Sequence, residues 1–335
     1  MTLRASPLPA IPGPKLAPFT PTASADIKFI KKLGHSIDKD GHVWKVDIKD
    51  RGPFALKIFP FLPWTSIQSG RAIKLARPLR SPQSYVDYFA PFNAECRVYG
   101  RLEQEDRQDL AVRAHGYLFL TSDQEADITQ RILDHGWDDE WDDDDDAVET
   151  DGLGHKMWCR HESDRGQPIR AIVKELVEVV DENGGSSNVG FKPEQISQMW
   201  EDLERLHTFG ILVRDIHYRN YLGGKLVDFG RAWTMFHPCF DQIDPELLRA
   251  ERKQDMFDWE RLIVDYWMEE GSEFGSIPWP EGYEKALTDF QRFGIDQRDY
   301  DWYKWEESRE AAEAYVASNL YADESPPESD DERES

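Results

Sequence analysis

Carboxylate, amide and ammonium side chains occur along this sequence in an order that suits phosphoryl transfer from ATP. Asp215 and Asn220 stand five positions apart, and Asp228 opens an Asp-Phe-Gly triplet eight residues after Asn220. Lys57 follows a short apolar run far upstream. The reaction needs a cation on the phosphates, oxygen ligands for magnesium and a carboxylate near the acceptor hydroxyl. The residue types for this chemistry are therefore present.

Short elements are expected around these residues. The run Tyr221-Leu-Gly-Gly-Lys-Leu-Val227 predicts a tight hairpin between Asn220 and Asp228, because two β-prone pairs flank a Gly-Gly turn. A helix is predicted from Pro193 to Gly210, with apolar residues at helical spacing and a glycine placed to end it. This helix and hairpin would hold the loop that carries Asp215.

The upstream half of the chain predicts a sheet with one helix. Apolar runs over residues 27–33, 43–48 and 54–59, separated by turn residues, indicate antiparallel strands. A helix over 91–102 carries Glu95, and further strands are expected over 112–120 and 169–180. Downstream, helical periodicity covers 256–267 and 307–321.

The net charge of −25, from 40 basic and 65 acidic residues, is concentrated in two segments. Residues 138–151 hold ten acids and no base, and residues 322–335 hold seven acids and one arginine, so the rest of the chain carries only −9. Because DNA binding needs clustered basic side chains, direct nucleic-acid binding is not expected. We expect residues 1–26 to be a disordered proline-rich arm, 121–167 a disordered acidic insertion, and 322–335 a disordered acidic tail.

Two other features bound the location. No apolar run reaches 18 residues, so no membrane span is expected. The three cysteines are odd in number and far apart, which favours a reducing compartment. We therefore expect an intracellular protein of the nucleus or cytoplasm, and the sequence leaves its oligomeric state open.

The run Val213-Arg-Asp-Ile-His-Tyr-Arg-Asn220, the Gly-Gly hairpin and Asp228-Phe-Gly230 together resemble the catalytic loop, hairpin and magnesium loop of the protein-kinase-like superfamily. Phe54-Ala-Leu-Lys57 resembles the strand motif whose lysine holds the nucleotide phosphates, and Glu95 is similar to the helix glutamate that pairs with that lysine. Gly34 and Gly41 occupy the place of the glycine-rich phosphate loop.

The resemblance implies a role for each of these residues. Asp215 would be the catalytic carboxylate, and Asn220 and Asp228 would hold Mg²⁺. Lys57 and Glu95 would position ATP, with Gly34 and Gly41 in the phosphate loop. Further on, Asp244-Pro-Glu246 resembles a shortened end of the activation segment, and Asp255 stands near the start of the central helix of the large lobe.

Some positions depart from the kinase pattern. Gly34 and Gly41 are the only glycines of the phosphate loop, and Val213 stands where protein kinases usually have histidine. His217 resembles the loop of aminoglycoside and choline kinases, whereas Arg219 resembles the loop of tyrosine kinases. The class of acceptor therefore stays open.

The stretches Phe92 to Leu102 and Leu206 to Leu222 are also similar to fungal kinase-like proteins grouped with the Fta kinetochore-complex subunits. Together the resemblances imply an α+β, two-lobed kinase-like fold. An antiparallel small lobe would cover 27–175 and a mainly helical large lobe 176–321.

The main functional hypothesis is an ATP- and magnesium-dependent phosphotransferase that acts on protein Ser/Thr. One alternative is a pseudokinase scaffold, a kinetochore- or chromatin-associated subunit without catalysis that binds protein partners. The other alternative is a small-molecule kinase.

Overall fold

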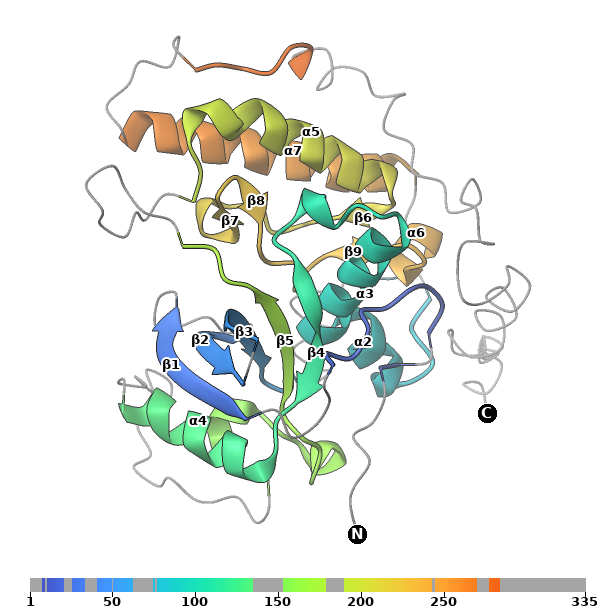
Figure 1. Ribbon diagram of the computed structural model, residues 1–335. Helices are drawn as coiled ribbons and strands as arrows, with labels where there is room; N and C mark the ends of the chain where they lie inside the picture. The colour runs from blue at the N-terminus through green and yellow to red at the C-terminus, as the bar shows by residue number, and fades with distance from the viewer. Residues whose placement is uncertain are drawn as a thin grey trace, which may run out of the picture.

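The computed structural model describes residues 8–9, 11–20, 26–33, 41–49, 51–62, 75, 77–134, 153–178, 190–242, 245–269 and 277–283. A five-stranded antiparallel sheet forms one part of this body, in the order β1-β2-β3-β5-β4. Its strands are β1 (Ile27–Leu33), β2 (His42–Ile48), β3 (Pro53–Phe59), β4 (Ala114–Phe119) and β5 (Arg170–Glu175). The sheet lies below a group of helices in Figure 1.

Alternation along the central strands separates two faces of the sheet. Because successive side chains of a strand point to opposite faces, Leu56 and Ile58 of β3 lie on one face and Lys57 on the other. Leu56 and Ile58 join a core cluster that also contains Ile128. Lys57 therefore lies on the opposite face, which is covered by helix α3 (Pro91–Gln104).

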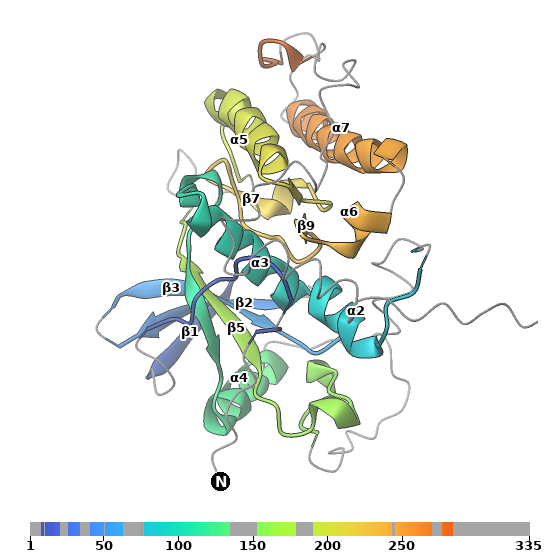
Figure 2. The same ribbon diagram turned by 90° about the vertical axis from the view of Figure 1, so that its right-hand side faces the viewer.

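Helix α3 (Pro91–Gln104) packs between the sheet and the rest of the molecule. It begins at a proline in its first turn, which suits that position because the first amides of a helix have no partner within it. It contacts β5 of the sheet and β9 (Trp233–Thr234) of the other part. A shorter helix, α2 (Pro82–Phe89), precedes it, and Figure 2 shows the two running one after the other.

The other part of the molecule is mainly helical. Helix α5 (Ile196–Thr208) packs against the long helix α7 (Pro245–Glu269), and α6 (Pro238–Gln242) lies near the start of α7 (Figures 1 and 2). Two short antiparallel pairs complete it: β6 (Ile211–Leu212) with β9, and β7 (Tyr221–Leu222) with β8 (Lys225–Leu226). The hairpin and the helix predicted from Pro193 are confirmed, and so is a mixed α/β protein with an antiparallel sheet.

The prediction of a disordered N-terminal arm is wrong for residues 11–20, which we call the N-terminal segment. Ile11, Leu16 and Phe19 are all buried. The amide of Leu16 donates to the Cys96 carbonyl at 2.8 Å, and that of Phe19 donates to the Tyr117 carbonyl at 2.7 Å. Prolines exclude a regular helix, but they do not prevent apolar residues between them from packing on a folded surface.

The acidic insertion is also partly folded, contrary to expectation. Its first residues form α4 (Ser122–Asp134), which buries Ile128 and Ile132 against the sheet. Near its end, Trp158 is fully buried, and Arg160 binds both carboxylate oxygens of Glu125 at 2.6 and 2.7 Å. The acidic composition concealed an apolar stripe at helical spacing. The aspartate run over 142–146 lies outside the described residues.

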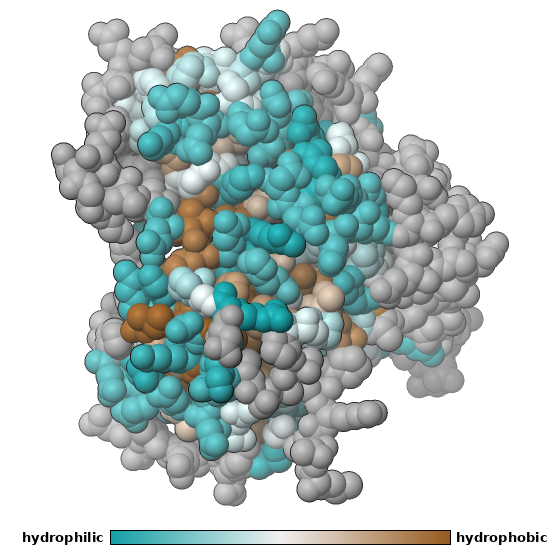
Figure 3. Space-filling view, viewed as in Figure 1, coloured by the Kyte–Doolittle hydropathy of each residue, from teal (hydrophilic) through white to brown (hydrophobic). Residues whose placement is uncertain are grey.

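Two other predictions fall outside the described part of the chain. These are the helix over 307–321 and the acidic tail over 322–335. Within the described part, none of the helices has the length and apolar character needed to cross a membrane. The face shown in Figure 3 is mostly hydrophilic, with hydrophobic residues gathered where the sheet meets the helices above it.

Candidate functional site

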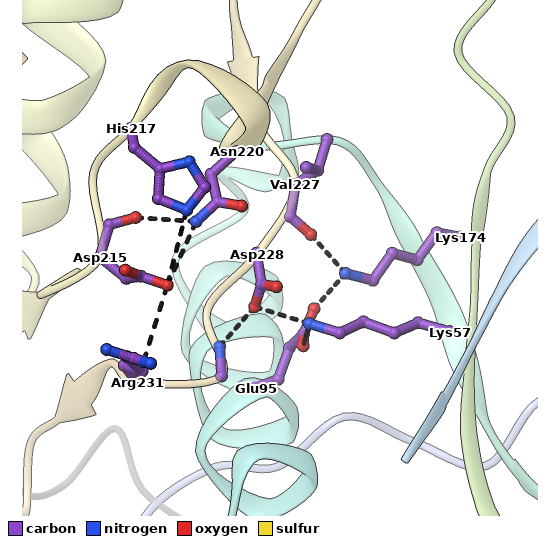
Figure 4. Close-up of polar contacts among 10 residues, drawn as sticks. Lys57, Glu95, Lys174, Asp215, His217, Asn220, Val227, Asp228 and Arg231 are labelled. Atoms are coloured by element: carbon purple, nitrogen blue, oxygen red, sulfur yellow. Dashed lines mark hydrogen bonds and ion pairs between the residues drawn. The ribbon is translucent and has the colours of Figure 1, made fainter. Parts of the chain in front are cut away.

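Lys57 and Glu95 meet between the sheet and α3. Lys57 extends from β3 toward the helix, and its Nζ lies 2.9 Å from Glu95 Oε2 (Figure 4). Lys57 is 4% exposed and Glu95 is fully buried. Since a buried charge is costly without an opposite partner, the contact between the two side chains offsets the cost of burying them. Two residues that the sequence placed in separate elements thus form one buried ion pair.

Asp228 joins this pair from the segment after the β7–β8 hairpin. Its Oδ1 lies 2.6 Å from Lys57 Nζ and accepts a hydrogen bond from the Gly230 amide at 2.7 Å. Burial by itself would raise the pKa of Asp228, but the charges of Lys57 and Lys174 outweigh it and hold that pKa well below its usual value. Burial would likewise lower the pKa of Lys57, yet Asp228 and Glu95 raise it. Both groups are therefore charged at neutral pH.

Lys174 of β5 is a fourth member that the sequence analysis missed. Its Nζ binds Glu95 Oε1 and donates to the Val227 carbonyl at 2.5 Å. It is 4% exposed. The signal in the sequence was a lysine inside the apolar run over 169–180, two residues after Ile172 and therefore on the same face of the strand.

Asp215 and Asn220 lie on the loop between β6 and β7. Asn220 Nδ2 donates to the Asp215 carbonyl at 2.8 Å and lies 3.4 Å from its Oδ2. His217 Nε2 and Arg231 Nε approach the same Oδ2 at 3.9 and 3.8 Å. The Asp215 side chain is 27% exposed, so its carboxylate is open to solvent. In Figure 4, Asp228 lies between this loop and the two lysines.

A buried carboxylate on α7 fixes the start of this loop. Asp255 accepts the amides of Val213 at 2.8 Å and Arg214 at 2.7 Å, and Arg214 adopts a positive φ of 61°. His207 Nε2 lies 3.0 Å from Asp255, and Arg252 donates to His207 Nδ1 at 3.0 Å. Because Nδ1 accepts a hydrogen bond from Arg252, the ring proton lies on Nε2, which donates a hydrogen bond to Asp255. Burial, the largest influence, lowers the pKa of His207 and keeps the ring neutral.

Of the two glycines predicted to form the phosphate loop, the structure describes Gly41 but not Gly34. Gly41 precedes β2 with φ of 152°, and a Cβ there would lie 2.7 Å from the Ile58 carbonyl oxygen and 3.6 Å from Lys57 Cε. A side chain at this position would therefore crowd the strand that carries Lys57. Gly34 lies outside the described residues.

Oxygen atoms of Asp228 and Asn220 are the groups of this site that could help to bind a metal ion. Among the described residues, no group of three or more His, Cys, Asp or Glu side chains is arranged to bind a metal. Mg²⁺, however, is commonly bound by one or two protein oxygens together with substrate phosphates. Asn220 turns its Nδ2 to Asp215, and Figure 4 shows its Oδ1 on the side of Asp228. Asp228 and Asn220 thus fit a site of that type.

No curated protein matches the chain. A family model described as kinetochore Sim4 complex subunit FTA2 matches residues 4–233. The match covers more than half of the 335 residues and includes the N-terminal segment, the sheet, α3 and Asp228. The chain therefore belongs to the family of kinetochore Sim4 complex subunit FTA2.

Proposed function

We propose that this chain is a protein-binding subunit of a kinetochore complex, located on chromosomes in the nucleus. The family match over residues 4–233 carries this proposal. A tagged copy expressed in cells of the source organism should co-localise with centromeric chromatin and co-purify with other kinetochore proteins. A diffuse signal without such partners would contradict the proposal.

We further propose that the fold is of the two-lobed kinase-like type. The sheet with α3 would form the small lobe and the helices α5 to α7 the large lobe. Three observations support it: the Lys57–Glu95 pair between β3 and α3, the Asp215–Asn220 loop after α5, and Asp228 directly after the β7–β8 hairpin. Shared fold does not by itself give function, so the chemistry must be argued from the site.

The site favours binding of ATP with Mg²⁺. In support of this, Lys57 is held by two carboxylates at 2.9 and 2.6 Å, which keep its ammonium charged, as a phosphate-binding group must be. Asp228 and Asn220 would hold the metal, which when bound neutralises charge on the phosphates. Gly41 allows the backbone before β2 to lie close to Lys57.

A thermal-shift titration tests nucleotide binding. ADP and ATP with Mg²⁺ should raise the melting temperature, since a ligand that binds only the folded state stabilises it. Asp228→Asn should abolish the magnesium-dependent part of the shift. An exposed carboxylate on α4 offers a matched control, and Asp123→Asn should behave as the wild type. Equal shifts in all three proteins, or no shift at all, would contradict nucleotide binding at this site.

Phosphoryl transfer is a second candidate function, favoured by one observation. Asp215 presents a solvent-accessible carboxylate on the same loop as Asn220, where a general base for an acceptor hydroxyl would be needed. Transfer of labelled phosphate from ATP to the chain itself or to co-purified kinetochore proteins should be lost in Asp215→Asn. Nucleotide binding without any transfer would instead support the scaffold role alone.

A further inference from the structure

Lys174 is a second buried lysine of the site and contacts Glu95, the carboxylate that Lys57 also contacts. Its ammonium is bound by Glu95 Oε1 and by the Val227 carbonyl, and lies 5.2 Å from the centre of the Tyr99 ring. These three contacts come from α3 and from the segment that leads into Asp228. The side chain therefore joins β5, α3 and the Asp228 segment.

The four charged groups form an alternating series. Asp228 contacts Lys57, Lys57 contacts Glu95 through Oε2, and Glu95 contacts Lys174 through Oε1. Each carboxylate oxygen of Glu95 thus has its own lysine. With Lys174 the buried set is neutral, and without it the set would carry one negative charge.

This division of partners determines what Lys57 is able to do. A fully buried carboxylate with a single lysine would hold that lysine tightly, because moving the cation away leaves an uncompensated charge. Lys174 removes this penalty, since Glu95 keeps one cation whichever partner Lys57 takes. The Val227 carbonyl gives Lys174 a second, neutral acceptor that keeps it in place.

We propose that Lys174 is the permanent counter-ion of Glu95, a positioning residue that frees Lys57 to move from Glu95 to the phosphates of a nucleotide. This inference rests on the proposed nucleotide binding. Lys174 itself does not contact the phosphates in this scheme. Its effect on the ligand passes through the charge of Glu95.

A double-mutant cycle tests this role by calorimetric titration of Mg²⁺–ADP. Lys174→Met should weaken binding about tenfold or more, because the site gains net negative charge and Lys57 stays bound to Glu95. In a Glu95→Gln background, the same Lys174→Met change should alter affinity by less than about threefold, because the Glu95 charge that Lys174 balances is no longer present. Lys28→Met, at an exposed lysine of β1, is the matched control and should leave affinity unchanged.

Each other outcome has a distinct meaning. If Lys174→Met weakens binding equally with and without Glu95→Gln, Lys174 contacts the ligand directly and the counter-ion role is wrong. Unchanged affinity in Lys174→Met also overturns it. If Lys174→Met fails to fold, restored folding in the charge-balanced double variant, with an affinity within about threefold of Glu95→Gln alone, supports the counter-ion role. A larger loss of affinity, or a double variant that also fails to fold, overturns it. A wild-type protein that binds no Mg²⁺–ADP overturns both this inference and the proposed nucleotide site.

Discussion

Replacing Gly100 by alanine should loosen the N-terminal segment from α3 and reduce the stability of the protein. Gly100 lies inside α3, where an added Cβ would overlap the backbone of Lys15. The contact is with backbone atoms, so a change of rotamer does not relieve it. One turn earlier, the Cys96 carbonyl accepts the Leu16 amide at 2.8 Å and fixes the segment at this distance.

Two opposing effects set the size of the change. Gly→Ala within a helix normally stabilises by about 0.5–1 kcal/mol, because alanine loses less backbone entropy on folding. Forcing extra atoms into a packed contact costs about 1–3 kcal/mol. With the middle of each range, the clash outweighs the gain and the net loss is about 1 kcal/mol. The loss cannot exceed the free energy gained by packing the segment, because at that cost the segment would detach from the body. That gain comes from burying Ile11, Leu16 and Phe19, at about 1.5–3 kcal/mol for each side chain.

Urea unfolding combined with hydrogen exchange measures both parts of this prediction. The midpoint should fall in Gly100→Ala, and exchange of the Leu16 and Phe19 amides should accelerate because both are bonded to the body. Glu103→Ala, at an exposed position of the same helix, is the control and should change stability by less than about 0.5 kcal/mol. Stabilisation by Gly100→Ala with unchanged exchange would refute the packing of the segment on α3.

Three further predictions concern groups remote from the Gly100 contact. Burial, with a smaller effect of Lys32, lowers the pKa of His42 to about 4, so the free energy of unfolding should fall as the pH drops below about 6.5. In urea unfolding, His42→Gln should reduce the loss of stability between pH 7 and pH 5 by about 2 kcal/mol. A variant that loses as much stability as the wild type over this pH range would contradict the prediction. Asp255→Ala should cost about 3–5 kcal/mol in the same assay by leaving two loop amides and His207 without their acceptor, whereas a loss below about 1 kcal/mol would show that the loop does not depend on it. Trp158→Ala should lower the free energy of unfolding by about 3–5 kcal/mol if the end of the acidic insertion is part of the core, and a neutral effect would exclude that packing.

The sequence predicted best those parts of the site where residue type and spacing both carry information. The turn at Gly223-Gly224 and the apolar stripe of α5 have strong local signals, and the structure confirms both elements. That Lys57 and Glu95 form a pair followed from the resemblance to kinases, because their separation of 38 residues carries no local signal. Their contact in the structure agrees with that expectation, while their role in binding ATP stays a prediction.

The remaining features depend on contacts that leave little trace in a single sequence. Asp255 acts on the backbone amides of Val213 and Arg214, and a bond to a backbone amide does not depend on which side chain that residue carries. The sequence around Lys174 predicts only a buried apolar strand, because the partners of this lysine come from other elements. The N-terminal segment was judged by its prolines, although its burial depends on Ile11, Leu16 and Phe19 and on the surface that receives them.

The central claim, that the buried network around Lys57 is a nucleotide site, is tested most directly by the affinity of the purified chain for Mg²⁺–ADP. Wild-type protein should bind one ADP in the presence of magnesium, and Lys57→Met should weaken that binding at least about tenfold, since it removes the ammonium held between Glu95 and Asp228. Absence of binding by the wild type, or equal affinity in the two proteins, would contradict the claim.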